Sequence, residues 1–555
     1  MTTETKQETA VEDIKRSSNY LRGAISRELD NGVASVSNES EQILKFHGIY
    51  AQDNRDVRRE RAVKGEALDY IFMIRVAIPG GRLTTNQWLA LDGAATDVAD
   101  GTIRLTTRQA VQFHGVLKDG LRPLARSVDV HLMTSFGACG DVVRNVVSCP
   151  ELQGNDADER LREISRHLTR SFRATTEAHW EIFVNGDKAV SREEVAERPF
   201  YGETYLPRKF KIAVAHPEEN CVDVLAQDVG LIPGVHPGVG EGFNLTVGGG
   251  VGRAYANPDT FARLADPMTF VTYDEVEEVI AAVLVTYREL GDRTDRKRAR
   301  MKYVVADMGY EQFRKEIEVR LGRELREPLP LPTHFDADDH LGWRTHPDGS
   351  HQIGVRVSAG RVRDDETSRL RTALRLIALR YPVTFFLTPQ QDIVISAVPD
   401  AARESVEEIL GSHGVRPDAE LGNVERTALA CPALPTCGQA LAEAERRLPE
   451  LVGNIEGALA RRQLGRRALQ LRMTGCPNGC ARPAVAEVGV VGRTKSTYDV
   501  YVGGGPRGDR LAKLYREKVP FDEIAVVLGP LFDRWEVDGD DEESFGDFIA
   551  RVGVE

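Results

Sequence analysis

The strongest constraint on the fold is that two distant segments, 71–116 and 355–398, repeat the same order of elements. Each segment changes from an alternating apolar pattern to a helical one and back, which predicts a strand, a helix and a strand. The matches predict an internal duplication, and two unrelated αβ units that share common dipeptides are the alternative. The matching motifs are Gly81-Arg82 with Gly360-Arg361 and LTxxQ at 105–109 with LTxxQ at 387–391. Outside these segments VGGG occurs at 247–250 and again at 502–505, which indicates that both halves repeat a larger unit.

The composition is that of a large globular protein. With 555 residues, 41% of them hydrophobic, the chain is longer than one core requires. Its formal net charge of −13 does not favour nucleic acid or anionic lipid as a partner. Residues 1–12 contain no signal-peptide core, and the apolar stretch 279–285 is too short to cross a membrane. We therefore expect a cytoplasmic protein without a membrane partner.

Four of the seven cysteines lie between residues 431 and 480. Cys431 and Cys437 occur in ACPALPTCG, and Cys476 and Cys480 occur in TGCPNGC. Proline and glycine keep such segments irregular, so that four thiolates can converge on an iron–sulfur cluster. A tetrahedral zinc site and unliganded thiols are the alternatives.

The other three cysteines, Cys139, Cys149 and Cys221, show no familiar ligand spacing, and we expect small buried apolar residues. The low, odd number of cysteines also argues against a secreted disulfide framework.

Basic residues occur in apolar, strand-like sequence although the chain is acidic. Arg75 lies within such a strand, and Lys209 and Lys211 are two apart, so on a strand they share one face. Cations of this kind beside a redox metal indicate an anionic ligand, either a polycarboxylate cofactor or an oxyanion. The basic run at 293–302 alone is more typical of a solvated helix.

Several motifs together resemble the hemoprotein (beta) subunits of the siroheme and 4Fe–4S sulfite and nitrite reductase family. The similarity extends from about residue 17 to residue 548. The motifs are FHGIYAQDNRD (46–56), PGGRLTTNQW (79–88), IRLTTRQAVQFHG (103–115), YLPRKFK (205–211), NLTVGGG (244–250), GDRTDRK (291–297) and TGCPNGC (474–480).

The resemblance implies an α+β (mixed α/β) fold in which duplicated αβ units are related by a pseudo-two-fold axis. We expect a repeated ferredoxin-like domain and two αβ domains that bind siroheme and the cluster. The expected division is an N-terminal arm at 1–70, paired ferredoxin-like half-domains at 71–136 and 345–418, and αβ domains at 137–344 and 419–555.

The resemblance also assigns residues. Cys431, Cys437, Cys476 and Cys480 would hold the 4Fe–4S cluster, and Cys480 would also be the axial ligand of the siroheme iron. The expected catalytic residues, which bind the oxyanion and deliver protons, are Arg75, Arg144, Lys209 and Lys211. The expected siroheme-binding residues are Arg104, Arg108, His114, Arg208, Arg300, Asn478 and Cys480. Arg300 stands where flavoprotein-partnered relatives have lysine, and His114 is equally consistent with a packed core histidine.

The implied activity is six-electron reduction of sulfite to sulfide in sulfur assimilation. Reduction of nitrite to ammonia by the same cofactors is the alternative, and a non-catalytic zinc protein is a remote one. Lys211 favours sulfite, because nitrite-specific relatives tend to have asparagine there. No flavin-binding or GxGxxG segment is evident, so we expect electrons from a partner, either an NADPH-dependent flavoprotein or a ferredoxin.

Overall fold

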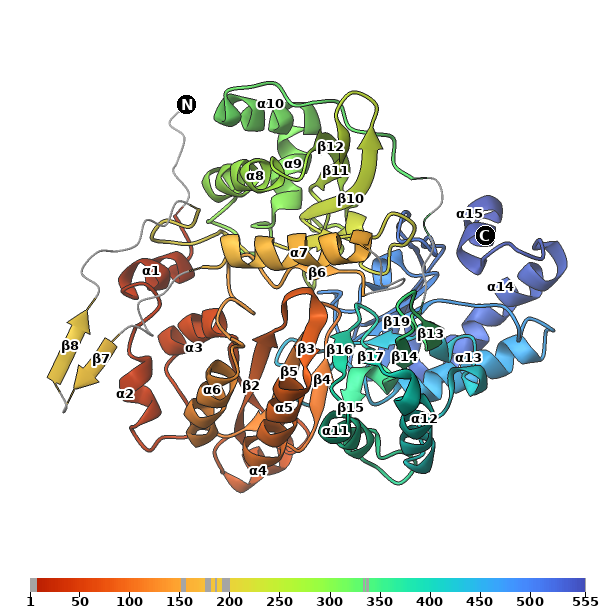
Figure 1. The fold of residues 1–555 in the computed structure, drawn as a ribbon, viewed down its shortest axis with the longest axis horizontal. Helices are drawn as coiled ribbons and strands as arrows, with labels where there is room; N and C mark the ends of the chain where they lie inside the picture. Colours follow the sequence, from red (N-terminus) through yellow and green to blue (C-terminus); the bar gives the residue numbers. More distant parts are fainter. Residues whose placement is uncertain are drawn as a thin grey trace.

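The computed structural model describes residues 7–150, 156–174, 181–184, 187–191, 200–332, 335 and 339–554. Within these residues the chain forms four five-stranded sheets and one short hairpin, with helices packed on the sheets (Figure 1). None of the described helices is both long and apolar enough to span a bilayer. The hairpin consists of β7 (Glu181–Val184) and β8 (Asp187–Ser191).

Two of the sheets have the same strand order and exchange one strand. The first sheet runs β1-β2-β5-β4-β15 and the second runs β13-β14-β17-β16-β3. Strand β3 comes from the first segment and pairs with β16, while β15 comes from the second and pairs with β4. The strands are β1 (Ile49–Asp53), β2 (Tyr70–Ala77), β3 (Arg82–Thr84), β4 (Ile103–Leu105), β5 (Ala110–Val116), β13 (Gly342–Thr345), β14 (His351–Val355), β15 (Arg361–Val362), β16 (Thr384–Leu387) and β17 (Ile393–Val398).

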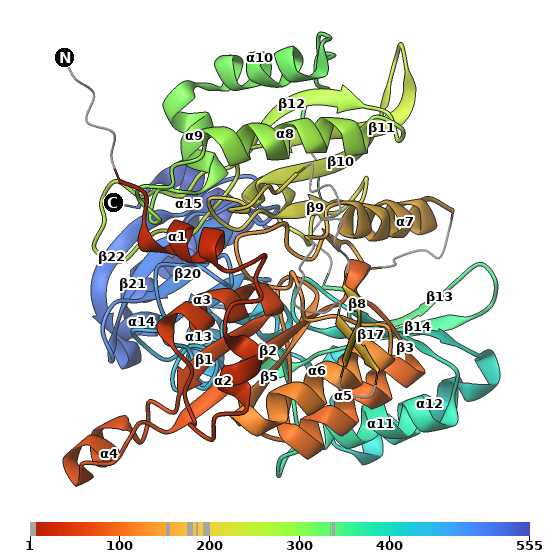
Figure 2. The ribbon, with the colours of Figure 1, turned by 90° about the vertical axis from the view of Figure 1, so that its left-hand side faces the viewer.

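The exchange explains the matching Gly-Arg motifs, since Arg82 begins β3 and Arg361 begins β15. One apolar core is shared by residues of both sheets, and Trp88 stacks on Phe385 across it with ring centroids 5.0 Å apart. Four helices cover these sheets (Figure 2): α5 (Thr85–Val98), α6 (Leu121–Val130), α11 (Leu370–Arg380) and α12 (Arg403–Ser412).

The other two sheets also share one topology. They run β6-β9-β10-β11-β12 and β18-β19-β20-β21-β22; in each, the first two pairings are parallel and the last two antiparallel. The VGGG motifs begin at the last residues of β11 and β21. The strands are β6 (Val147–Ser148), β9 (Ile212–Val214), β10 (Val229–His236), β11 (Gly240–Val247), β12 (Asp266–Val271), β18 (Leu429–Ala430), β19 (Leu471–Thr474), β20 (Val488–Gly492), β21 (Thr497–Val502) and β22 (Lys513–Pro520).

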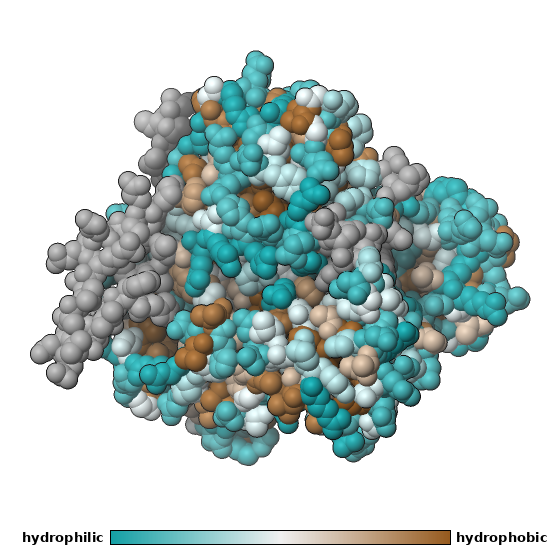
Figure 3. Space-filling model, viewed as in Figure 1, coloured by the Kyte–Doolittle hydropathy of each residue, from teal (hydrophilic) through white to brown (hydrophobic). Residues whose placement is uncertain are grey.

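Each of these sheets has its own apolar core, covered by helices at the top and centre of Figure 1 for the first sheet and at the right for the second. In Figure 3 hydrophilic residues cover most of the visible face and apolar residues form small separate groups, because the large apolar side chains fill the cores. The helices are α7 (Asp156–Ser171), α8 (Val276–Leu290), α9 (Met301–Met308) and α10 (Tyr310–Leu321) on the first sheet, and α13 (Leu448–Ala460), α14 (Ile524–Asp538) and α15 (Phe545–Val552) on the second.

The N-terminal segment is helical and is tied to the first of these αβ units. Lys15 is buried and lies 3.1 Å from the Asp141 carboxylate, while its Nζ donates to the Leu206 carbonyl at 2.9 Å. Strand β1 also lies in this segment and is an edge strand of the first sheet, so that sheet begins before residue 71. The helices are α1 (Ala10–Ser17), α2 (Ile25–Leu29), α3 (Asn38–Leu44) and α4 (Arg58–Lys64).

Candidate cofactor and substrate site

The four clustered cysteines follow two neighbouring parallel strands. Ala430 at the end of β18 is paired with Met473 of β19, so the residues after these strands leave the sheet at the same edge. Cys431 follows β18 directly, and the loop after β19 carries Cys476 and Cys480. The Gly475 N–H donates to Cys431 Sγ at 3.3 Å, and Asn478 Nδ2 donates to Cys476 Sγ at 3.5 Å.

The pKa values of three of these thiols are raised, so those cysteines favour their protonated form in the protein alone. Burial and then the neighbouring Cys480 together raise the pKa of Cys476 to about 12. Burial and the same neighbour raise the pKa of Cys431 and of Cys437. Thiolates crowded in this way become stable only beside a cationic centre, and therefore the donor set fits a metal cluster.

Cys480 differs from the other three because its side chain is exposed. Its carbonyl accepts a hydrogen bond from Thr107 Oγ1 at 3.1 Å, which ties the cysteine loop to the turn after β4. Gly252, just beyond the first VGGG motif, lies against the same loop: a Cβ there would come within 2.6 Å of the Asn478 carbonyl. This close approach explains why glycine is needed at that position.

Three of the predicted basic side chains are set side by side by a short backbone pairing. Phe210 bridges to Val143, and the Arg144 N–H donates to the Phe210 carbonyl at 2.9 Å. Lys209 and Lys211 flank Phe210 on an extended segment that leads into β9 and is not itself part of that strand. The pairing therefore brings Arg144 next to both lysines.

The lysines lie in strongly positive surroundings. Burial, together with Arg300 and Arg208, lowers the pKa of Lys209 to about 7, while Cys480 opposes the shift. Burial, then Lys209 and Arg300, lower the pKa of Lys211 far below its ordinary value. Such a group of cations next to a thiol fits a polyanionic ligand, since an anion would restore the charged form of each lysine.

Two of the predicted arginines are held in place by protein groups. Arg75 in β2 donates from Nη1 to Cys139 Sγ at 3.1 Å. Arg144 donates from Nε to the Gly140 carbonyl at 2.9 Å and from Nη1 to the Ala138 carbonyl at 3.2 Å.

Apart from Asn478 and Cys480 of the cysteine loop, the predicted siroheme-binding residues fall into two groups. Arg108, Arg208 and Arg300 surround the lysines, because each contributes to the pKa shift of Lys209 or Lys211. Arg104 and His114 are fully or almost fully buried in β4 and β5, where Arg104 lies 3.0 Å from the Glu445 carboxylate and donates to the Ala430 carbonyl at 2.7 Å. The second group therefore lies on the cysteine side of the site.

The basic run at 293–302 is not a solvated helix. Residues 293–300 are irregular and only Met301 and Lys302 belong to a helix, α9, so the interpretation as a solvated helix was wrong; its charges find buried partners instead. Arg296 donates to the Asp141 carboxylate at 2.9 Å, and Arg300 donates to Asp228 at 2.8 Å. Asp228 also accepts the Lys211 N–H at 2.9 Å, so it links both basic segments.

Sequence reasoning missed several residues that support the site. Arg55 donates to the Cys437 and Ala440 carbonyls at 3.1 and 2.6 Å, although it lies in the quoted motif FHGIYAQDNRD. Asp223 forms ion pairs with Arg472 and Arg482, and Arg482 is two residues beyond Cys480. No local pattern marks these residues, because each partner is distant in the sequence.

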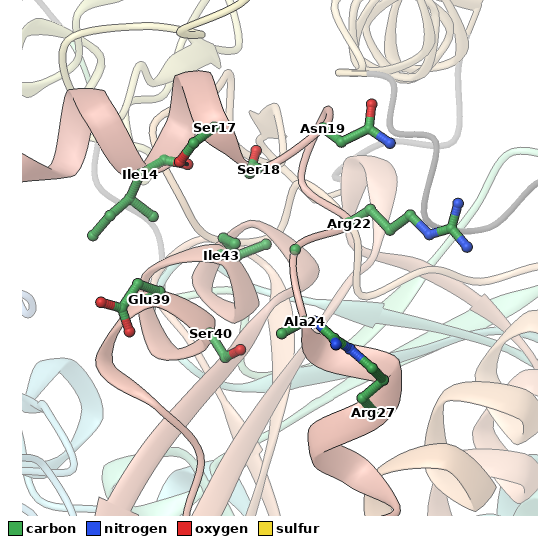
Figure 4. A pocket seen from close by; sticks show the side chains of 11 residues that line it. Ile14, Ser17, Ser18, Asn19, Arg22, Ala24, Arg27, Glu39, Ser40 and Ile43 are labelled. Carbon is green, nitrogen blue, oxygen red and sulfur yellow. Dashed lines mark hydrogen bonds between the residues drawn. The ribbon is translucent and has the colours of Figure 1, made fainter.

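A pocket of about 490 Å³ lies elsewhere, between α1, α2 and α3 (Figure 4). Ile14 and Ile43 form its apolar part, and Arg22, Arg27 and Glu39 its polar part. It contains none of the predicted site residues.

Fold and site together define a class: a duplicated αβ protein with a four-thiol centre beside a cationic pocket, as a redox enzyme for small anions requires. The family model of the nitrite and sulphite reductase 4Fe-4S domain matches residues 163–325 and 421–555, and that of the nitrite/sulfite reductase ferredoxin-like half domain matches residues 64–129. The chain belongs to the nitrite and sulfite reductase family.

Individual relatives agree with this assignment. The sulfite reductase (NADPH) hemoprotein beta-component of Staphylococcus saprophyticus is 40% identical over 546 residues, which cover 98% of this chain and 95% of that one. The corresponding protein of Myxococcus xanthus is 42% identical over 552 residues, with coverage of 98% and 96%. The solved structure of Mycobacterium tuberculosis NirA superposes with a TM-score of 0.80 at 25% identity, covering 99% of this chain and 97% of NirA. The mixed α/β fold expected from the sequence is thereby confirmed.

Proposed function

We propose that this chain is the hemoprotein of a cytoplasmic sulfite reductase and reduces sulfite to sulfide with six electrons. The observation that carries the proposal is the position of Cys480, whose exposed thiol belongs to the four-cysteine group and also acts on the pKa of Lys209 in the cationic pocket. Electrons held at the cysteine group thus lie next to the place where an anion binds.

Two cofactors fit these residues. Cys431, Cys437, Cys476 and Cys480 would hold a 4Fe–4S cluster, and Cys480 would also bind the siroheme iron. The basic residues Arg108, Arg208 and Arg300, with Asn478 nearby, would bind siroheme carboxylates, and Arg104 and His114 would line the side towards the cluster. When bound, the siroheme supplies an iron that coordinates the substrate and passes on electrons from the cluster.

The chain's own residues bind the oxyanion and supply protons. Arg75 and Arg144 are fixed by the hydrogen bonds described above, so each can present remaining N–H donors to sulfite oxygens. Lys209, whose pKa is about 7 in the protein alone, is poised to give a proton near neutral pH. Each of the three sulfite oxygens leaves as water and takes two protons, while the sulfur gains six electrons and becomes sulfide.

The shared core of the two exchanged sheets supports a division into paired half-domains at 71–136 and 345–418. The separate cores of the other two sheets support αβ domains at 137–344 and 419–555. Under this division, the first αβ domain and the first half-domain supply the basic pocket, and the second αβ domain supplies the four thiols.

Steady-state assays with sulfite and nitrite test the activity. We expect a higher kcat/KM for sulfite, and Lys211→Asn should lower the sulfite value more than the nitrite value because it removes a cation near the oxyanion. Brisk nitrite turnover without sulfite turnover in the purified, cofactor-loaded enzyme would contradict the proposal.

The relatives' names also favour an NADPH-dependent flavoprotein as electron donor. Reconstitution with such a flavoprotein, compared with reduced ferredoxin in the same assay, distinguishes the two donors. We expect the flavoprotein to support sulfite reduction.

A further inference from the structure

A second group of metal-binding side chains lies apart from the four-cysteine group. Cys149, Glu219, Cys221 and His340 each offer one ligand atom, and these atoms all lie within 4.8 Å of one another. The Cys149 thiol donates to one Glu219 carboxylate oxygen, and His340 Nε2 lies 3.3 Å from the other. All four residues are buried, with exposed fractions of 7%, 2%, 3% and 1%.

The position of this group follows from the duplication. Cys149 directly follows β6, as Cys431 directly follows β18 in the matching sheet. Cys221 precedes the short helix η4 (Val224–Ala226) by three residues, as Cys480 precedes η9 (Pro483–Val485). The residues that cap these two helices, Asp223 and Arg482, both have positive φ, 48° and 56°. Cys149 and Cys221 thus occupy the positions that Cys431 and Cys480 hold in the other repeat.

The supporting contacts are duplicated too. The Gln109 side chain accepts the Ser148 N–H at 2.9 Å, just before Cys149, and the Gln391 side chain accepts the Ala430 N–H at 3.3 Å, just before Cys431. Both glutamines end the repeated LTxxQ motif. The same hydrogen bond to a glutamine side chain therefore orients the end of the strand before each cysteine.

We propose that Cys149, Glu219, Cys221 and His340 bind one structural zinc ion at the pseudo-symmetric counterpart of the cluster site. Two thiolates, an imidazole nitrogen and a carboxylate oxygen suit zinc, and a tetrahedral site with Zn–S of about 2.3 Å and Zn–N of about 2.0 Å needs ligand atoms about 3 to 4 Å apart. The four residues close the site without a position for substrate, which is typical of a structural zinc. Binding releases the thiol protons and involves no redox change.

The ion would join three segments that are distant in the sequence. These are the end of β6, the loop that carries Glu219 and Cys221, and the segment just before β13. The Cys221 N–H already donates to Glu219 at 3.0 Å, so the loop presents both ligands together. Because Asp223 in this loop pairs with Arg482, the zinc would also steady the chain next to Cys480.

Metal analysis of the purified holoenzyme, produced in zinc-supplemented medium and handled without chelators, tests this proposal. We expect one zinc per chain in addition to iron. Zinc K-edge absorption, to which the iron centres do not contribute, should show two sulfur ligands at about 2.3 Å and two nitrogen or oxygen ligands at about 2.0 to 2.2 Å. This measurement on the unaltered protein does not depend on any variant folding.

Variants then locate the ion. Cys221→Ala and His340→Ala should each lose the zinc, while the matched controls Cys139→Ala and His346→Ala, which alter buried residues outside the group, should retain it. Four observations would overturn the proposal: unaltered protein without zinc, zinc with four sulfur ligands or with none, a disulfide between Cys149 and Cys221, or zinc retained in both Cys221→Ala and His340→Ala.

Discussion

At the scale of single residues, the candidate site is built from basic side chains that lie close together. Burial lowers the pKa values of Lys209 and Lys211, and the neighbouring Arg300 lowers them further. Their apolar sequence context and the family resemblance mark both lysines as candidate site residues. The sequence could not predict the crowding, because Arg300 reaches the lysines through Asp228 from a segment that sequence reasoning assigned to a solvated helix.

Replacing Lys209 should separate function from stability. In Lys209→Met we expect kcat/KM for sulfite to fall about 10²-fold or more, because a proton donor and a cation are lost. Without siroheme, the same variant should unfold at a higher temperature than the original chain, because a buried cation is removed.

The stability gained in Lys209→Met should depend on pH. The folded chain binds the Lys209 proton with a pKa of about 7, well below the ordinary lysine value, so its destabilising effect is full below pH 7 and fades as the pH rises towards 10. Free energies of unfolding of the siroheme-free chains at pH 7 and pH 9 check this. The increase in the free energy of unfolding caused by Lys209→Met should be smaller at pH 9 than at pH 7. It should be absent in the control Lys297→Met, which alters an exposed lysine. Equal gains at both pH values would contradict the argument.

At the scale of elements, the repeated Gly-Arg motif marks the two strands, β3 and β15, that the sheets exchange. Repetition of Gly-Arg and LTxxQ was enough to predict two related αβ segments, since both motifs are local. That each Arg begins a strand of the opposite sheet was not predictable, because pairing partners such as Arg82 and Phe386 are far apart in the sequence. The four clustered cysteines were predicted for the opposite reason: the members of each pair, Cys431 with Cys437 and Cys476 with Cys480, lie close together in the sequence.

Gly360, at the start of this exchange, should tolerate no side chain. It has φ of +72°, and a Cβ would come within 2.7 Å of the Leu105 carbonyl and closer still to the Arg104 guanidinium. Gly360→Ala should lower the free energy of unfolding by about 2 to 4 kcal/mol, the sum of backbone strain and overpacking.

Gly349→Ala is the matched control. Gly349 has φ of +81° but nothing within 4 Å of a Cβ, so only the backbone strain of about 1 kcal/mol should remain. Denaturant titrations of both variants measure the difference, and equal losses would show that the contact with β4 is unimportant.

At the scale of the whole molecule, the two αβ units meet at a buried ion pair. Asp223 belongs to the first unit, and Arg472 and Arg482 belong to the second. Burial alone would raise the pKa of Asp223, but the two arginines outweigh it and lower the pKa below its ordinary value. Neither this pairing nor the Cys149 group was predictable, because their members come from separate segments and show no spacing.

Asp223→Asn should destabilise the chain by about 3 to 5 kcal/mol at pH 7, because two buried arginines lose their partner. Since the folded pKa of Asp223 is lowered, its contribution is present above the ordinary pKa and disappears as the pH falls through the lowered value. Denaturation at neutral pH, compared with Asp56→Asn in an exposed ion pair with Arg446, measures the effect. The control should lose less than about 1 kcal/mol, and a similar loss in both variants would refute the role of burial.

The strand exchange also bears on how the chain is made. During synthesis β3 emerges early, but its partner β16 follows only after the whole of the sheet from β6 to β12 has been made. The first sheet likewise lacks the strand that pairs with β4 until β15 has been synthesised. Neither half can therefore complete its hydrogen bonding as the ribosome releases it, and an unfinished edge stays open to wrong partners until the second half arrives. The fold that places the thiols next to the basic pocket can close only late in translation.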